Sequence, residues 1–123
     1  MHIRTIGLAA AALCAFSSAP ANAEMDGTEI LERIDKGSMA DQIALISYKV
    51  AYDWANSRLQ FEKKEPFFCA PPKLSMTPDQ TIDIFREQVK KNMAAAKTPA
   101  GLVMLYALTD TFPCDKKAQG KQP

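Results

Sequence analysis

The chain has 123 residues, of which 15 are basic and 14 acidic, for a formal net charge of +1. This length is enough for one domain behind an N-terminal leader and too short for two. The near-neutral charge balance gives no reason to expect a nucleic acid or an anionic membrane surface as a partner.

The first 23 residues have the pattern of a cleavable export signal. Residues 1–4 form a short positive start, residues 6–16 an apolar run, and Ala21-Asn22-Ala23 a small-residue cleavage site. A membrane anchor is the alternative, but the apolar run is shorter than the roughly 20 residues of a spanning helix. We therefore expect an exported chain that begins at Glu24, with no membrane segment after cleavage, and that loses Cys14 with the signal.

Residues 24–114 are expected to form one all-α domain, a compact bundle of about four helices, followed by a polar tail over residues 115–123. The first helix is predicted over Thr28–Lys36, ending at Gly37. Ser38 then begins a second helix, with Asp41 three residues later as a weak capping box.

Helix-start signals mark two further helices. Thr77 is placed as the cap of the third helix, Pro78 as its first residue and Gln80 as the reciprocal capping residue. Thr98-Pro99 begins a fourth helix in the same way, and Phe112-Pro113 ends it.

The second helix, predicted over Met39–Gln60, is apolar in two directions. At 100° per residue, two nearly opposite stripes form, one of Met39, Ile43, Ile46, Val50 and Trp54, the other of Leu45, Tyr48, Tyr52 and Leu59. A flank of small residues between them would let another helix approach closely (Ala40, Ala44, Ser47, Ala51 and Ala55). The opposite flank is polar and expected to be solvated (Gln42, Lys49, Asp53, Asn56 and Gln60). We interpret this segment as a central helix with neighbours on both sides; the alternative is an exposed stripe used for dimer or partner contact.

The last two cysteines are placed for a disulfide. Cys69 precedes the third helix and Cys114 follows the fourth, and two antiparallel helices would return the second cysteine toward the first. Exported proteins form and keep such bonds. A redox-active thiol pair is the alternative, but the C-x-x-C spacing is missing.

Catalytic groups are scarce. The single histidine, His2, lies in the leader, so the exported part lacks the usual general base and zinc ligand. No phosphate-binding glycine loop or EF-hand spacing occurs either. We expect no enzyme, no cofactor and no metal site.

The connection from Phe61 to Met76 is long for a helical bundle. Two interpretations stay open: its phenylalanines plug the end of the bundle, or it protrudes as a recognition loop. The candidate partner-binding residues are Glu62, Lys63, Lys64, Glu65, Phe67 and Phe68 in this loop, with Tyr48 and Tyr52 as a second possible contact.

Several segments occur together in a characteristic order: Phe68–Pro72, Met76–Gln80, Ala100, Leu105–Leu108 and Phe112–Cys114. Over Tyr48 to Cys114 the chain thereby resembles the Rap/Tai family of type VI secretion amidase immunity proteins. The resemblance implies a small exported helical protein with a disulfide, held in the periplasm, that binds and neutralises a secreted peptidoglycan amidase.

Two other properties stay open. A homodimer is possible, and the alternative function is that of a small periplasmic acid-stress chaperone, a class that shares the size and the single disulfide.

Overall fold

The computed structural model describes residues 24–115, which form four α-helices: α1 (Gly27–Asp35), α2 (Met39–Phe61), α3 (Pro78–Lys91) and α4 (Ala100–Thr111). A short 3-10 helix, η1 (Ala95–Lys97), lies between α3 and α4. This range contains no strand, and an isolated bridge joins Asp26 and Pro99. The all-α architecture with about four helices is confirmed. The predicted export signal and residues 116–123 of the tail lie outside the described residues.

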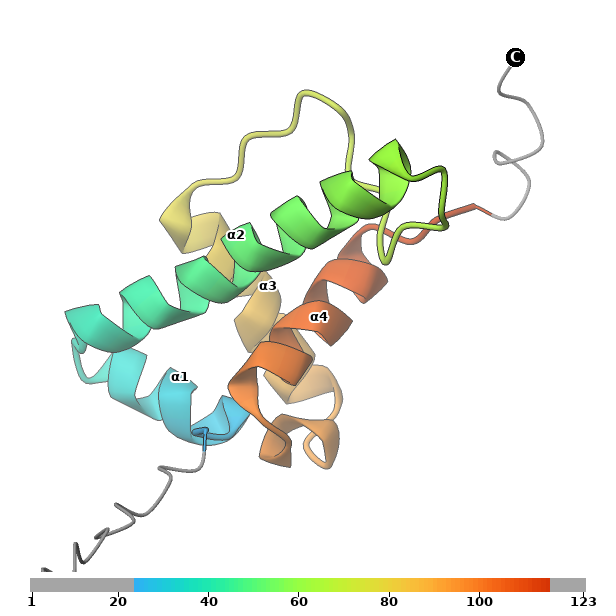
Figure 1. Cartoon of the computed structure of the whole chain (residues 1–123). Coiled ribbons are helices and arrows are strands. Elements are labelled where there is room, and N and C mark those ends of the chain that lie inside the picture. Colours follow the sequence, from blue (N-terminus) through green and yellow to red (C-terminus); the bar gives the residue numbers. More distant parts are fainter. Residues whose placement is uncertain (1–23, 116–123) are drawn as a thin grey trace, which may run out of the picture.

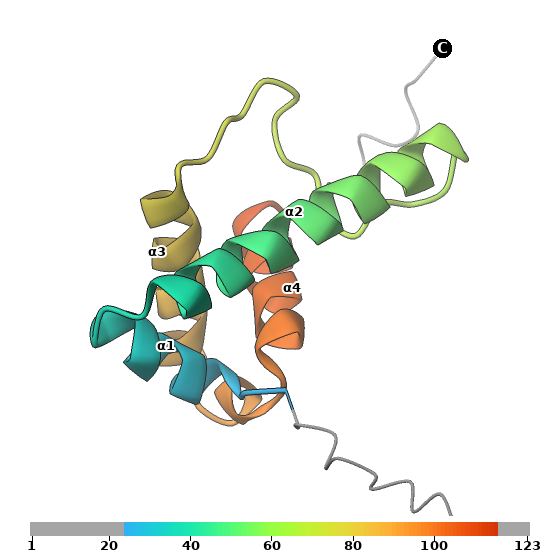
Figure 2. The ribbon, with the colours of Figure 1, turned by 60° about the vertical axis from the view of Figure 1, so that its left-hand side comes forward.

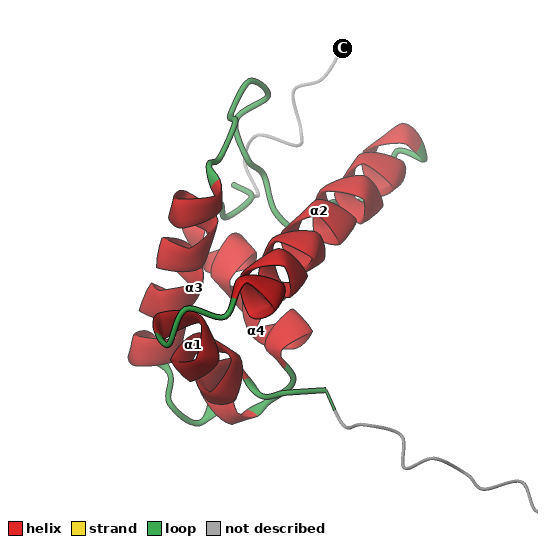
Figure 3. Ribbon diagram, turned by 90° about the vertical axis from the view of Figure 1, so that its left-hand side faces the viewer, coloured by secondary structure: helices red, strands yellow, loops and turns green. Residues whose placement is uncertain are grey.

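The long helix α2 crosses the pair formed by α3 and α4 (Figures 1 and 2). Helix α1 lies beside the first half of α2, at the end of the bundle where η1 also lies (Figures 1 and 3). All four helices and the segment after α2 contribute fully buried side chains to one core, among them Ile30, Leu45, Phe68, Phe85 and Met104. None of the described helices is long and apolar enough to cross a membrane.

The first two helices begin and end by local chemistry. Asp26 caps α1 by accepting from the Glu29 N–H at 2.8 Å, and Gly37 follows the helix at φ +90°, where a side chain would be strained. Ser38 caps α2 and bonds the Asp41 carboxylate, which also pairs with Arg33 at 2.9 Å. The Ser38 hydroxyl, with Arg33 adding to it, holds the pKa of Asp41 below its usual value. The predicted start of α2 at Ser38 is confirmed.

The capping box of α3 is present as predicted. The Gln80 N–H donates to Thr77 Oγ1 at 3.2 Å, and the Thr77 N–H donates to Gln80 Oε1 at 2.9 Å. Pro78 occupies the first turn, where no N–H partner is needed.

The start of α4 differs from the prediction. Thr98 does not cap the helix, because its hydroxyl donates back to the Ala95 carbonyl of η1 at 2.6 Å. The first N–H groups of α4 are instead satisfied from the other end of the chain. Ala100 donates to the Met25 carbonyl at 2.9 Å, and Gly101 donates to Glu24 Oε1 at 2.8 Å.

The disulfide between Cys69 and Cys114 is present, with the two Cα atoms 4.9 Å apart. A hydrogen bond of 2.8 Å from the Cys69 N–H to the Phe112 carbonyl runs beside it. The segment after α2 is thereby fixed to the end of α4.

Candidate partner-binding site

The loop between α2 and α3, residues 62–77, is anchored at its centre and exposed on both sides of that anchor. Phe68 lies in the core with 2% of its surface exposed, whereas the neighbouring Phe67 is 47% exposed. The loop was predicted either to close the end of the bundle or to protrude for recognition, and each interpretation holds for one of the two phenylalanines. Phe68 plugs the end of the bundle, and Phe67 is presented to solvent.

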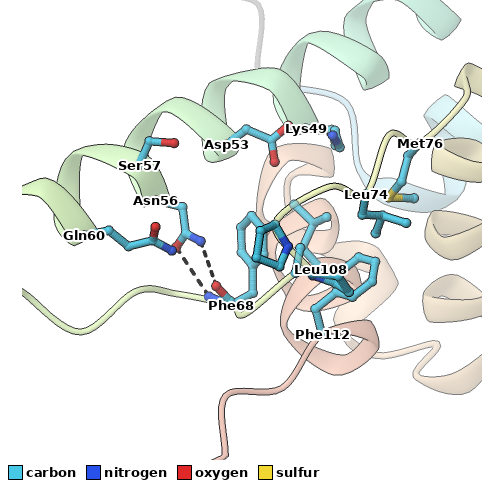
Figure 4. A pocket seen from close by; sticks show the side chains of 13 residues that line it. Lys49, Asp53, Asn56, Ser57, Gln60, Phe68, Leu74, Met76, Leu108 and Phe112 are labelled. Carbon is cyan, nitrogen blue, oxygen red and sulfur yellow. Dashed lines mark hydrogen bonds and ion pairs between the residues drawn. The ribbon is translucent and has the colours of Figure 1, made fainter. Parts of the chain in front are cut away.

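Asn56 of α2 holds this anchor in place. Its side-chain oxygen accepts from the Phe67 N–H at 2.7 Å. Its side-chain nitrogen donates to the Phe68 carbonyl at 2.7 Å (Figure 4). The prediction that Asn56 belongs to a solvated flank is wrong, because Asn56 is buried. A buried amide satisfied by backbone groups fixes the direction in which the loop leaves the bundle.

The charged tip of the loop is largely neutralised within the chain. Glu62 pairs with Arg58 at 2.6 Å and with Lys64 at 2.7 Å. The hydrogen bond from Lys64, then that from Arg58, holds the pKa of the Glu62 carboxyl below its usual value. Lys63, Lys64 and Glu65 are exposed, so this tip carries solvent-accessible cationic donors three and four positions before Phe67 in the chain.

A cleft of about 210 Å³ separates α2 from the second half of the loop (Figure 4). One wall of the cleft is a polar side of α2, and the opposite wall is apolar. The polar wall consists of Lys49, Asp53, Asn56, Ser57 and Gln60, and the apolar side of Phe68, Ala70, Pro71, Pro72, Leu74, Met76, Leu108 and Phe112. Such an open, two-sided cleft suits a side chain of a protein partner better than an enclosed small molecule.

The two tyrosines of α2 are used within the fold. The Tyr52 hydroxyl donates to the Gly101 carbonyl at 2.9 Å, and a Cβ at Gly101 would lie 3.2 Å from the Tyr48 ring. Burial, reinforced by Glu24, raises the pKa of Tyr48 to about 12. The close approach of α2 to another helix therefore occurs at these tyrosines, while the small-residue flank leaves Ala40, Ser47 and Ala51 exposed.

The opposite stripe of α2 is open to solvent, so the prediction of a central helix with neighbours on both sides is wrong. We call this face the outer stripe and define it by Met39, Ile43, Ile46, Val50, Trp54 and Phe61. Trp54 is 75% exposed and Phe61 is 81% exposed, with the Arg58 guanidinium 5.9 Å from the centre of the Phe61 ring. Only Ile46 of the stripe is half-buried.

Among residues 24–115, no three metal-ligating side chains gather into a cluster. The exposed aromatic side chains, cationic donors and apolar stripe are the kinds of groups that protein-binding surfaces use.

The family model described as Rap1a immunity proteins matches residues 11–114. The chain belongs to this family. No curated protein and no solved structure shows a significant match.

An immunity protein acts by binding an effector protein, so the Rap1a family membership gives the exposed surfaces described above a function class. The match ends at Cys114 and so includes the whole disulfide-anchored loop. This membership confirms the family that the sequence motifs predicted.

In this Rap1a family member, Asn56 is the site residue that the sequence did not single out. Replacing Asn56 by Ala leaves the Phe67 N–H and the buried Phe68 carbonyl without partners. We expect the free energy of unfolding to fall by about 2 kcal/mol or more, since each unsatisfied buried group costs roughly 1–3 kcal/mol. Urea denaturation measures this change.

The matched control is Ser57→Ala, one residue further along α2, where the side chain is exposed and hydrogen-bonds to no described residue. It should leave the free energy of unfolding nearly unchanged. Equal effects of the two substitutions would mean that the Asn56 hydrogen bonds contribute little.

Proposed function

We propose that this protein is a periplasmic immunity protein that binds and inhibits a peptidoglycan amidase delivered by a type VI secretion system. The observation that carries the proposal is the match of the Rap1a immunity family over residues 11–114. The motif resemblance to amidase immunity proteins supplies the class of effector.

Two features support the compartment. The first 23 residues have the pattern of an export signal, and the Cys69–Cys114 disulfide is a bond that oxidising compartments maintain. Peptidoglycan lies outside the cytoplasm, so an inhibitor of a wall amidase has to be present there.

The proposed mechanism is stoichiometric occlusion of the amidase by the anchored loop. Phe67 follows Lys63 and Lys64 by four and three positions, on a segment that the Asn56 hydrogen bond at Phe67 and the disulfide at Cys69 anchor to the bundle. An exposed aromatic side chain with charged neighbours has the composition of a binding hot spot and its rim. Because the loop is fixed before binding, little conformational entropy is lost on docking.

The test combines inhibition with protection. The purified protein should inhibit its paired amidase at one chain per amidase. A chain without residues 1–23 should fail to protect cells from the exported amidase. Protection by the signal-deleted chain would contradict the proposed compartment. Absence of amidase binding, together with suppression of client aggregation at low pH, would favour the chaperone alternative.

The contact is tested by the triple variant Lys63→Ala/Lys64→Ala/Phe67→Ala. We expect binding to weaken by at least about 2 kcal/mol, with the helical circular dichroism unchanged, because the substituted side chains are exposed. Calorimetric titration with the amidase measures the loss.

A matched control removes the same kinds of side chain elsewhere. Lys90, Lys91 and Met93 are also two lysines and an apolar residue, all exposed at the end of α3. The variant Lys90→Ala/Lys91→Ala/Met93→Ala should keep its affinity. An unchanged affinity in the loop variant would move the contact to another surface, such as the face that contains Tyr48 and Tyr52.

A further inference from the structure

The cleft between α2 and the α2–α3 loop has the size and the lining of a site for one side chain. Its volume of about 210 Å³ lies below the roughly 300–1,000 Å³ of usual small-molecule pockets. Figure 4 shows polar side chains of α2 along one side and Leu74, Met76 and Phe112 along the other. A side chain that enters the cleft therefore needs an apolar stem for one wall and a polar end for the other.

The more accessible charge in this cleft is negative. Lys49 and Asp53 form an ion pair at 2.6 Å, in which the lysine side chain is 17% exposed and the aspartate side chain 41%. Lys49 donates to Oδ2 of Asp53, and no hydrogen bond from a described residue reaches Oδ1. An ionised carboxylate accepts up to about four hydrogen bonds, so Asp53 keeps acceptor capacity on its open side.

The order of the pair along the helix leaves Asp53 available. Lys49 lies four positions before Asp53, and an acid that precedes its base by four positions stabilises a helix better than this order does. Ion pairs of this spacing contribute little to stability, because water competes with them and their side chains lose rotational freedom. A second cation can therefore share or take over the Asp53 carboxylate at little cost to the fold.

The cleft adjoins the contact proposed above. Phe68, whose carbonyl accepts from Asn56, is one of the cleft residues, and Phe67 precedes it in the chain. We therefore expect an amidase that packs on Phe67 to lie within reach of the cleft for a long side chain.

We propose that the cleft receives a basic side chain of the amidase, with its charged end on the Asp53 carboxylate and its apolar stem against Leu74 and Phe112. This inference rests on the proposed amidase inhibition, since the amidase supplies the side chain. Ser57 and Gln60 lie about one and two turns further along the polar wall, where they offer neutral acceptors. Arginine suits this wall better than lysine, because its planar group presents five donors in a fixed fork.

The two members of the ion pair should give opposite results. Asp53→Asn removes the charge that the basic side chain contacts, and the dissociation constant of the amidase complex should rise at least about tenfold. Lys49→Met keeps an apolar stem and removes the competing cation, so the dissociation constant should fall about threefold or more. Calorimetric titration with the paired amidase measures both changes. Weaker binding by both variants is the result of a merely structural role of the pair, and it overturns the proposal.

The ion pair between Glu32 and Lys36 on α1 is the matched control. It has the same spacing, its atoms are 2.7 Å apart, and neither residue lines the cleft. Glu32→Gln and Lys36→Met change the net charge in the same two ways and should leave the affinity nearly unchanged. Effects as large as those at Asp53 and Lys49 would indicate a general attraction between charged surfaces, which overturns a contact in the cleft.

The apolar wall is tested separately. Leu74 is 45% exposed at the mouth of the cleft, so Leu74→Ala should hardly change the free energy of unfolding. It should raise the dissociation constant about threefold or more, because the stem of the basic side chain loses its packing. An unchanged affinity would place the charged contact outside the cleft and overturn the two-walled site.

The tail of the chain is the alternative source of a basic side chain. Residues 116–123 contain three lysines and begin two positions after Cys114, which the disulfide joins to Cys69 beside the cleft. The effect of Asp53→Asn should persist in a chain that ends at Asp115. Its disappearance in that chain would assign the cleft to the tail and overturn the amidase as its occupant.

Failure of this inference and failure of the proposed function differ in the same titration. A wild-type chain that does not bind the amidase overturns both. A wild-type chain that binds it with the affinity of both Asp53→Asn and Lys49→Met overturns the contact in the cleft and leaves the proposed inhibition standing.

Discussion

Replacing Phe68 by Ala is expected to lower the free energy of unfolding by about 3–5 kcal/mol, the usual cost of removing a fully buried phenylalanine. Phe68 is 2% exposed and belongs to the same core as Leu45, Phe85 and Leu108. The substitution leaves a cavity at the point where the α2–α3 loop enters the bundle. Because a domain of this size has only about 5–15 kcal/mol in total, a large part of the stability should disappear. Urea denaturation followed by circular dichroism measures it.

The neighbouring residue supplies the control. Phe67→Ala removes the same side chain from a position that is 47% exposed, so the expected loss is below about 1 kcal/mol. Phe67→Ala should nevertheless weaken amidase binding, although it hardly lowers the free energy of unfolding. Similar losses of stability at both positions would contradict the assignment of Phe68 as the plug and Phe67 as the presented side chain.

Removing the disulfide is the second change with a large expected effect. Cys69 and Cys114 are 45 positions apart, and closing a loop of that length stabilises a fold by about 4 kcal/mol in the chain-entropy model. The variant Cys69→Ser/Cys114→Ser should therefore lose about 2–5 kcal/mol and melt many degrees lower. Thermal unfolding measures the difference.

Two checks accompany this measurement. Intact mass should show the wild-type chain lighter by two hydrogens than its reduced form, which establishes that the bond is present. Reduced wild-type protein should melt near the double variant. An oxidised wild type that melts at the same temperature as the variant would show that the bridge contributes little to stability.

The features that the sequence predicted correctly are those set by neighbouring residues. Thr77, Pro78 and Gln80 lie within four positions, so their capping bonds need no contact with a distant part of the chain. The disulfide was predictable for a related reason, because a pair of antiparallel helices returns Cys114 to Cys69.

The orientation of α2 could not be predicted from periodicity. Two opposite apolar stripes fit the helix equally well, and spacing alone does not tell which one faces the core. In the structure the stripe with Leu45 faces the core, with Leu45 buried and Tyr48 and Tyr52 partly buried, while the stripe with Trp54 is exposed. The core side carries the tyrosines, whose hydroxyl groups need partners when buried, and Tyr52 finds one on Gly101.

Contacts between distant residues were also missed. Asn56 bonds residues 11 and 12 positions away, and Glu24 bonds Gly101 across 77 positions. No local spacing encodes either contact. The different fates of Phe67 and Phe68 did have a signal, since adjacent side chains in an extended segment point in opposite directions and only one of them can enter the core.

The anchoring of the loop at Phe68 has an evolutionary consequence. Asn56 bonds backbone atoms at the anchor, so these bonds are independent of the side chains on either side. Residues 63–65 and 71–75 are exposed, so we expect most substitutions there to change the free energy of unfolding little. An inhibitor built in this way can change its specificity as its toxin drifts, one surface residue at a time, without passing through unfolded intermediates.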